Sequence, residues 1–225
     1  MRNARQIGNL VITSDNSGAI GEKELDVVHV PDDVTSYYST RVTLLEQLAN
    51  QAIPKEIILL NFTSEEAWGK YITGINRVFE EVQIPVPAIS GSTETNMPTL
   101  QSGFGITMLG EKQRPLPNLS KLHWFTYGRP LVGEQLLQNV HQIANLQIIV
   151  EALKNQHITQ VIPLGSKGLQ KELEQLELID LVDVENVPYD STASAGPSTM
   201  VLIGVTAEQV ANISKILQHD LHRLK

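Results

Sequence analysis

Short apolar runs alternate along the first half of the chain with segments whose apolar residues recur every three or four positions. The short runs predict β-strands and the periodic segments predict amphipathic helices. The strands predicted here are residues 8–13, 25–30, 56–62 and 104–109, and the helices are residues 38–52 and 67–82. Residues 63–66 (TSEE) have the form of a capping box that opens the second helix. The run at 56–62 is almost entirely apolar, which is typical of a strand covered on both faces.

The second half has the same alternation after a proline-spaced segment at residues 114–118. The predicted strands are residues 122–127, 159–164, 178–184 and 199–205, and the predicted helices are residues 132–156, a short one ending near 176, and a terminal one with Val210, Ile213, Leu217 and Leu221 facing inward. This pattern predicts an α/β (α+β) protein with two domains, residues 1–114 and 122–225.

Composition narrows the function classes. The 225 residues carry a formal net charge of -8 and contain no cysteine. The acidic balance argues against nucleic acid as the main partner, although an acidic site can bind a nucleotide through Mg²⁺. The absence of cysteine excludes disulfides, thiolate catalysis and cysteine-ligated metals. No apolar run is long enough to span a membrane or to form a signal peptide, so we expect a cytoplasmic protein.

Two oxygen-rich segments in the first half are candidates for a metal–phosphate site. In the segment Ser14–Gly18 (SDNSG), which follows the first predicted strand, Asp15 is a candidate Mg²⁺ ligand; an Asx turn explains the same residues. In the predicted loop 90–98 (SGSTETNMP), Glu94 is a candidate ligand, with Ser92, Thr93 and Asn96 as hydrogen-bonding groups. A solvated loop with a chance cluster remains the alternative.

A glycine loop in the second half is the third candidate. Gly165, Ser166, Lys167 and Gly168 lie between a predicted strand and a predicted helix, where backbone N–H groups and a lysine can cradle an anion. The spacing is not that of a Walker A loop, and an ordinary strand–turn–helix connection explains it nearly as well.

The segment 191–198 is either a lid or a plain loop. His219 and His222 have helical spacing near the end of the predicted terminal helix, where capping explains them better than metal binding.

In this order, the segments resemble a known superfamily. Residues 90–98 resemble the GGETAEMP-type loop of aminoimidazole-ribonucleotide synthetase and the GGDT-type loop of thiamine-monophosphate kinase. The segment at 15–18 falls where that superfamily has an early acidic ATP/Mg²⁺ loop, residues 45–54 resemble its N-terminal-half helix, and residues 165–169 resemble its GGGL-type loop. Length and the string SDNSGAIGEKELD are most similar to the α-ribazole kinases of cobalamin salvage. Ser92 replaces the aspartate of the GGDT loop, and Ser166 and Lys167 interrupt the glycine run.

The resemblance implies a two-domain fold whose N-terminal halves pair in a homodimer through a shared β-barrel. It implies ATP and Mg²⁺ as cofactors, with Asp15 and Glu94 as metal-handling carboxylates and Asp26 as a third candidate. It also implies nucleotide contacts from three glycine-containing segments, which comprise Asn16, Ser17 and Gly18; Gly91, Ser92, Thr93 and Asn96; and Gly165, Ser166, Lys167 and Gly168.

The leading functional hypothesis is an ATP- and Mg²⁺-dependent kinase that phosphorylates an alcohol of a small nucleoside-like metabolite such as α-ribazole. Phosphoryl transfer depends more on positioning and charge neutralisation than on a strong base. The first alternative is a ligase or cyclase that uses an acyl-phosphate-type intermediate. The second is a non-catalytic nucleotide-binding module.

Overall fold

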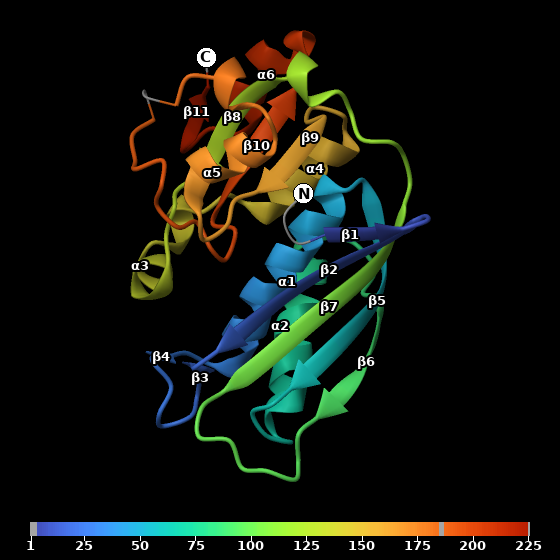
Figure 1. Cartoon of the computed structure of the whole chain (residues 1–225), viewed down its shortest axis with the longest axis vertical. Coiled ribbons are helices and arrows are strands. Elements are labelled where there is room, and N and C mark those ends of the chain that lie inside the picture. The colour runs from blue at the N-terminus through green and yellow to red at the C-terminus, as the bar shows by residue number, and fades with distance from the viewer. Residues whose placement is uncertain (1–3, 185–186, 225) are drawn as a thin grey trace. The chain divides into compact units, whose positions relative to one another are not determined.

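The computed structural model describes residues 4–184 and 187–224, and the chain folds as two compact units, residues 2–115 and 116–225 (Figure 1). The first unit contains β1 (Ala4–Ile7), β2 (Leu10–Gly18), β3 (Ile20–Gly21), β4 (Val28–His29), α1 (Asp32–Ala49), β5 (Ala52–Asn61), α2 (Ala67–Val82), β6 (Ala88–Thr93) and β7 (Gly103–Lys112). Five strands form one sheet in the order β1-β2-β7-β5-β6, and β3 pairs with β4 in a two-stranded ribbon. Within the main sheet, only the β5–β6 pair is parallel.

The sheet of the first unit is covered by helices on one face, which Figure 1 shows as α1 and α2 lying along the same side of the strands. Burial therefore alternates along β5, where Ile57 and Leu59 are buried while Ile58 and Leu60 are exposed. The prediction that residues 56–62 are covered on both faces is wrong. The sheet is open, and no closed barrel forms among the described residues.

Polar segments that we expected to be loops are strands. β2 continues through Gly18, because residues from Leu10 to Gly18 pair without interruption with β7. β6 likewise includes residues 90–93, which pair in parallel with β5. The prediction of a turn at Asp15–Gly18 and of a loop starting at Ser90 is therefore wrong. Conversely, only Val28–His29 of the predicted strand 25–30 is a strand.

The amphipathic helix predicted at residues 67–82 is confirmed as α2. Seven residues of α2 are buried, namely Ala67, Tyr71, Gly74, Ile75, Val78, Phe79 and Val82. Gly74 permits close packing on α1, since an added Cβ would lie 2.0 Å from the Asp33 carbonyl oxygen. The expected capping box does not form: Ser64 Oγ accepts from the Ala67 N–H, and the Thr63 hydroxyl is bonded to Tyr71 Oη instead.

The second unit is built on a four-stranded antiparallel sheet in the order β11-β8-β10-β9. Its elements are η1 (Leu119–Lys121), β8 (His123–Gly128), α3 (Gly133–Gln138), η2 (Val140–Gln142), α4 (Leu146–Lys154), β9 (Gln160–Pro163), α5 (Gly168–Gln175), η3 (Ile179–Leu181), β10 (Met200–Val205), η4 (Ala207–Gln209), α6 (Val210–Ile216) and β11 (Leu221–Arg223). A hydrophobic core that includes Trp124, Leu169 and Leu202 lies between this sheet and α5.

Three predictions for this unit are wrong. The helix expected at 132–156 is divided into α3, η2 and α4, and Asn145 starts α4 by accepting a 2.9 Å hydrogen bond from the Ile148 N–H. The segment 178–184 contains the short helix η3 and no strand among its residues, all of which are described. The terminal helix ends at Ile216, so His219 lies beyond it and His222 belongs to β11. None of the helices in the described ranges is long and apolar enough to cross a membrane.

Candidate functional site

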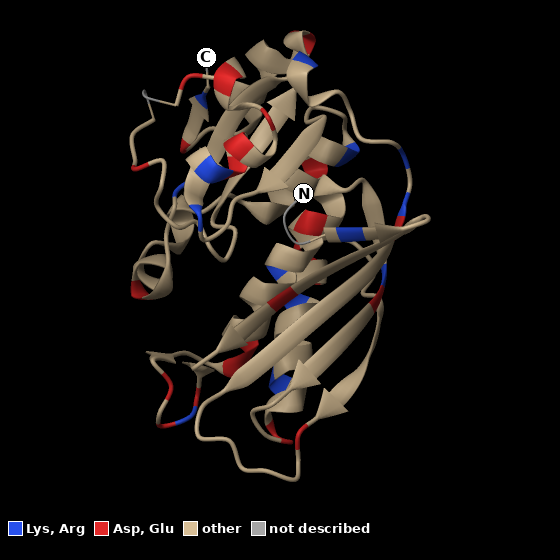
Figure 2. Cartoon of the chain, viewed as in Figure 1, with Lys and Arg blue, Asp and Glu red and all other residues tan. Residues whose placement is uncertain are grey.

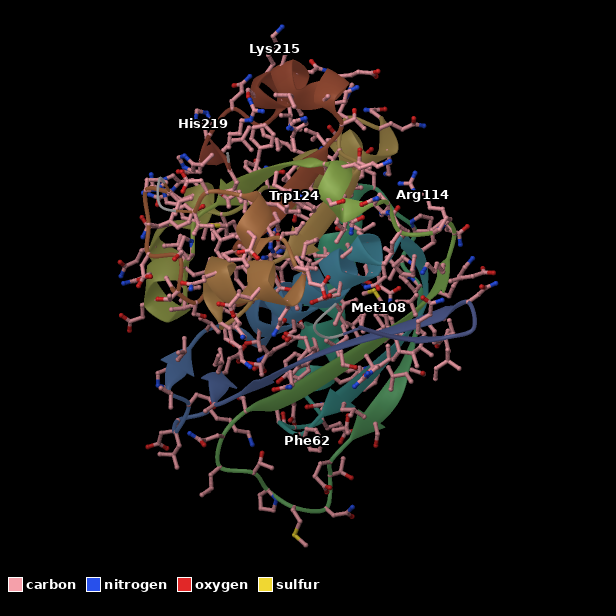
Figure 3. The ribbon with its side chains drawn as sticks, turned by 45° about the horizontal axis from the view of Figure 1, so that its top comes forward. Phe62, Met108, Arg114, Trp124, Lys215 and His219 are labelled. Atoms are coloured by element: carbon pink, nitrogen blue, oxygen red, sulfur yellow. The ribbon has the colours of Figure 1, made fainter. Side chains whose placement is uncertain are left out.

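Two loops meet at one end of the first unit's sheet. β2, β5 and β6 all end there and β7 begins there, because Gly18 is paired with Gly103, and Asn61 with both Phe104 and Thr93. The loops that emerge at this end, residues 19–31 and 94–102, are called the paired loops below. Phe62 lies at this end of the sheet, whereas Met108 is buried within β7 (Figure 3). The two main sequence motifs therefore lead into the same end of the molecule's first unit.

Hydrogen bonds hold the paired loops against each other. Ala19 donates its N–H to the Ser102 carbonyl oxygen at 2.9 Å, and Gln101 Nε2 donates to the Leu25 carbonyl oxygen at 2.6 Å. The ammonium group of Lys23 donates to both oxygens of Thr99, at 2.5 Å to the carbonyl and 2.6 Å to the hydroxyl. The loops thus form one structural unit.

Asp26 is the buried centre of this contact. Its carboxylate accepts from the Ser102 N–H at 2.7 Å, from the Ser102 hydroxyl at 2.6 Å and from the Lys23 N–H at 2.9 Å. Burial on its own would raise the pKa of Asp26, but these hydrogen bonds favour the charged form and together hold the pKa below its usual value. Asp26 therefore organises the loops, with its oxygens engaged by the protein.

Asp32, in the first turn of α1, has the opposite environment. It is only 3% exposed, and its Oδ1 atom has no hydrogen-bond partner. Burial, followed by the nearby Glu22 carboxylate, raises the pKa of Asp32 above its usual value. Glu22 accepts from the Asp32 N–H at 3.1 Å and is ion-paired with Lys70, whose bond lowers the pKa of Glu22. Figure 2 shows this acidic colouring in the β3–β4 loop and at the start of α1.

The first predicted motif is divided between the two faces of the sheet. Asp15 and Ser17 alternate with exposed neighbours and lie on the helix-facing side, in line with buried Thr13. Asn16 and Gly18 lie on the open side. Strand geometry therefore prevents the four residues from surrounding one ligand as a loop would.

The second motif is divided in the same way. Gly91 and Thr93 are aligned with Leu59 and Asn61 of the helix-facing side, while Ser92 is exposed on the open side beside Leu60. An added Cβ at Gly91 would lie 1.9 Å from the Leu59 carbonyl oxygen, so this position accepts only glycine without movement.

Glu94 follows β6 directly and begins its loop. Its Oε1 accepts from the Asn96 N–H at 2.7 Å and from the Met97 N–H at 3.2 Å. These bonds fix the turn, and Asn96 takes part through its backbone. Thr93 also has a local role, since its hydroxyl accepts from Asn61 Nδ2 at 3.2 Å.

The predicted carboxylates do not form a magnesium site within one chain. Asp15 is aligned across β7 and β5 with Gly91, so three strand spacings, about 14 Å, separate Asp15 from β6. Asp26 has its oxygens engaged by Ser102 and Lys23. Among residues 4–184 and 187–224, no group of three or more Asp, Glu or His side chains is placed to hold a metal ion. The residues present therefore do not fit the metal set that the resemblance implies.

The glycine loop of the second unit lies beside residues 191–198. Ala195 donates its N–H to the Gly165 carbonyl oxygen at 3.1 Å, and Gln170 donates to the Ser191 carbonyl oxygen at 3.0 Å. Gly168 has a φ of +75° and an added Cβ would lie 2.6 Å from the Thr192 backbone, so a side chain is excluded there. Ser166 and Lys167 are exposed at the start of α5. An anion contact by these two residues remains a prediction.

Sequence reasoning missed four of the groups that build the paired loops: Glu22, Lys23, Thr99 and Ser102. It also missed Asp32, which it did not include in a helix. The string EKELD at residues 22–26 contained a signal, because three carboxylates and a lysine in five residues are unusual beside a glycine. No sequence signal pointed to the hydroxyl partners, because Thr99 and Ser102 come close to this string only after the strands have paired.

Solved structures with a similar fold exist. No family model and no curated protein matches the chain. Thiamine-monophosphate kinase from Aquifex aeolicus has a TM-score of 0.61 at 11% identity, covering 97% of this chain and 84% of that protein. Hydrogenase maturation protein HypE has a TM-score of 0.65 at 13% identity, covering 98% and 80%. Thiamine-monophosphate kinase from Stenotrophomonas maltophilia has a TM-score of 0.62 at 14% identity, covering 98% and 83%. These likenesses support the aminoimidazole-ribonucleotide synthetase-like fold that the motifs indicate.

Proposed function

We propose that this chain is an ATP-dependent phosphotransferase that moves the γ-phosphoryl group of ATP to an alcohol of a small nucleoside-like metabolite. The observation that carries the proposal is a fold likeness spanning 96–98% of the chain to thiamine-monophosphate kinase and HypE structures. Related structures are described as complexes, one with AMPPCP and TMP and another with ATP. The paired loops gather backbone N–H groups, hydroxyls and the ammonium group of Lys23 at the sheet end, where these groups are bonded to one another and a phosphate would exchange with some of those bonds.

Within this proposal, the helix-facing members of the two motifs are the nucleotide-contacting residues. Asp15, Ser17, Gly91 and Thr93 share one side of the sheet, whereas Asn16 and Ser92 share the other. A substitution on each side makes a matched pair, Asp15→Asn against Asn16→Ala. We expect the first to weaken ATP binding about tenfold or more, because it removes the charged acceptor of a hydrogen bond from a nucleotide hydroxyl. Equal effects from both variants would contradict the assignment.

The activity test is ATP turnover with a panel of alcohols that includes α-ribazole, the acceptor suggested by the sequence string at residues 14–26. The expected products are ADP and one phosphate monoester, identified by mass. ATP binding measured by calorimetry with no turnover on any acceptor would instead favour the nucleotide-binding module. Free phosphate together with a cyclised or ligated product would favour the acyl-phosphate chemistry.

We also propose that the open face of the sheet pairs with a second copy of the chain. Large apolar side chains are exposed on or beside it, including Ile7, Leu10, Ile58, Leu60 and Phe62. These side chains gather on one face, whereas single apolar residues scattered over a surface need no explanation. Sedimentation of the wild type should show a dimer that Ile58→Asp shifts to monomer, with Thr73→Asp, exposed on α2 over the other face, as the control. A monomeric wild type would end this part of the proposal.

The HypE likenesses favour one further candidate, an ATP-using enzyme that acts with a protein partner. One of these structures is a HypE–HypF complex, matched over 98% of this chain at 13% identity. The same product analysis separates this candidate, because it consumes ATP without phosphorylating any small alcohol.

A further inference from the structure

Large apolar side chains are exposed on both of the paired loops. Val27 is 79% exposed, Leu100 76%, Met97 71% and Leu25 55%. One exposed side chain of this kind is ordinary, whereas four on two loops that are bonded to each other indicate a surface that binds something.

Backbone contacts fix the position of this apolar surface. Gln101, next to Leu100, donates to the Leu25 carbonyl oxygen at 2.6 Å, and the Thr99 hydroxyl, on the other side of Leu100, donates to the Phe62 carbonyl oxygen at 2.7 Å. The loops are therefore held by polar groups of the chain, while the apolar side chains stay exposed to a ligand.

The proposed function, on which this inference rests, places the acceptor against these side chains. An acceptor hydroxyl has to lie about 3–3.5 Å from the γ-phosphorus before transfer. With the phosphates at the paired loops, the body of the acceptor lies against whatever surrounds the phosphate-handling groups. Leu100 follows Thr99, which is bonded to Lys23, and precedes Ser102, which is bonded to Asp26.

The charges of the paired loops are mainly negative. Both loops lie wholly within the described ranges, and their four carboxylates, Glu22, Glu24, Asp26 and Glu94, outnumber their one lysine, Lys23 (Figure 2). An acceptor that already carried a phosphate group would bring up to about two more negative charges beside those of ATP. Like charges placed together disfavour a complex, and the loops have no second ammonium group to offset them.

We infer that the acceptor is an uncharged alcohol with an apolar ring system, and that Leu25, Val27, Met97 and Leu100 contact this ring. Contact with apolar side chains removes the ring from water, and the acidic surroundings select against a phosphorylated form of the same molecule. In the transfer, the acceptor oxygen forms a bond to the γ-phosphorus and the bond from that phosphorus to the bridging oxygen breaks. ADP leaves, and the hydroxyl proton passes to water.

The experiment compares α-ribazole, whose dimethylbenzimidazole ring is apolar and uncharged, with its phosphomonoester as acceptors for the full chain. We expect kcat/KM to be about a hundredfold higher for α-ribazole, because like-charge contacts are costly. Leu100→Ser should raise the KM for α-ribazole about tenfold and leave the KM for ATP unchanged, since apolar pocket contacts are worth about that much. Leu100→Met should restore the KM.

The matched control is Val86→Ser, which changes another exposed apolar residue of the same unit. Val86 precedes β6, whereas the paired loops lie where β6 ends, so it lies at the opposite end of the strand. Its kinetic constants should equal those of the wild type. Circular dichroism of each variant establishes that it is folded before its kinetics are compared.

Two results would overturn the inference and leave the proposed function intact. One is use of the phosphomonoester as good as that of α-ribazole. The other is an unchanged KM in Leu100→Ser, and a shift of that variant from dimer to monomer in sedimentation would then assign the apolar surface to a second copy. Absence of turnover with both molecules would sink the proposed function. Calorimetry then decides the inference separately, because α-ribazole binding that Leu100→Ser weakens supports it and no binding overturns it.

Discussion

Asp26 and Asp32 lie six positions apart in one short stretch of chain, and both are buried at the same end of a sheet. Asp26 accepts three hydrogen bonds from Ser102 and Lys23, and its pKa is lowered. Asp32 leaves an oxygen unpartnered beside Glu22, and its pKa is raised. The difference teaches that burial alone does not decide whether a carboxylate is protonated. The hydrogen-bond donors and the charges nearest to it decide the direction of its pKa shift.

The two regions therefore contribute to stability with opposite signs. The region around Asp26 stabilises the paired loops through charged hydrogen bonds. The start of α1 holds a carboxylate that the fold does not satisfy, which costs stability and is typical of a functional position. Substitutions at the two sites should separate these contributions.

Asp26→Ala should produce the largest loss. It leaves the Ser102 N–H, the Ser102 hydroxyl and the Lys23 N–H without their acceptor, which we expect to cost about 3 kcal/mol of unfolding free energy. Urea denaturation measures the loss, with Glu24→Ala on the same loop as the control. A change below about 0.5 kcal/mol would mean that the paired loops hold without Asp26.

As the pH falls, the titrations of Asp32 and then Asp26 should each change the free energy of unfolding. The pKa of Asp32 is raised on folding, so its charge costs stability above the folded pKa, and that cost is removed as the pH falls through it. The pKa of Asp26 is lowered on folding, so its contribution is full above the usual aspartate value and is lost as the pH falls through the folded pKa. Denaturation measured from neutral to acid pH should therefore show the free energy of unfolding first rise and then fall. The rise should be absent in Asp32→Asn.

Asp32→Asn should stabilise the protein. The amide fills nearly the same volume and removes a buried charge, so we expect a gain of about 1 kcal/mol, or a rise of about 2–4 °C in Tm. Calorimetry of the two proteins at the same pH measures it, and a lower Tm for the variant would show that the charge is stabilising after all.

Glu22→Gln should have the smallest effect. The pair with Lys70 is partly exposed, so its loss is worth about 0.5 kcal/mol at most. The same change removes the charge next to Asp32 and should lower the pKa of Asp32. An NMR titration of the Asp32 carboxyl carbon reports that shift, and an unchanged pKa would show that burial alone raises it.

The sequence was sufficient for elements whose signal is local. The stripe of α2 from Ala67 to Val82 was predicted because each buried residue recurs at helical spacing along one segment. Local composition failed where pairing decides the structure. The polar stretch Asp15–Gly18 is a strand only because β7, about ninety residues later, supplies its ladder.

The candidate site was predictable only in part, for the same reason. Both main motifs lie toward one end of the sheet, but the turn and the loop predicted for them are strands, whose alternation divides Asp15 from Asn16 and Gly91 from Ser92. The residues that join the loops, Lys23 with Thr99 and Asp26 with Ser102, are separated by 76 positions. Such contacts become visible only when the fold is known.

The order of strands in the first sheet has a consequence for how the protein is made. β7 is the last strand of its unit along the chain, yet it lies in the centre of the sheet between β2 and β5. In a nascent chain that ends before Gly103, β2 can pair only with β1 and β5 only with β6, so one edge of each strand stays open to wrong associations. The first unit can therefore close only after residue 112 has left the ribosome, and protection by a chaperone matters most during that interval.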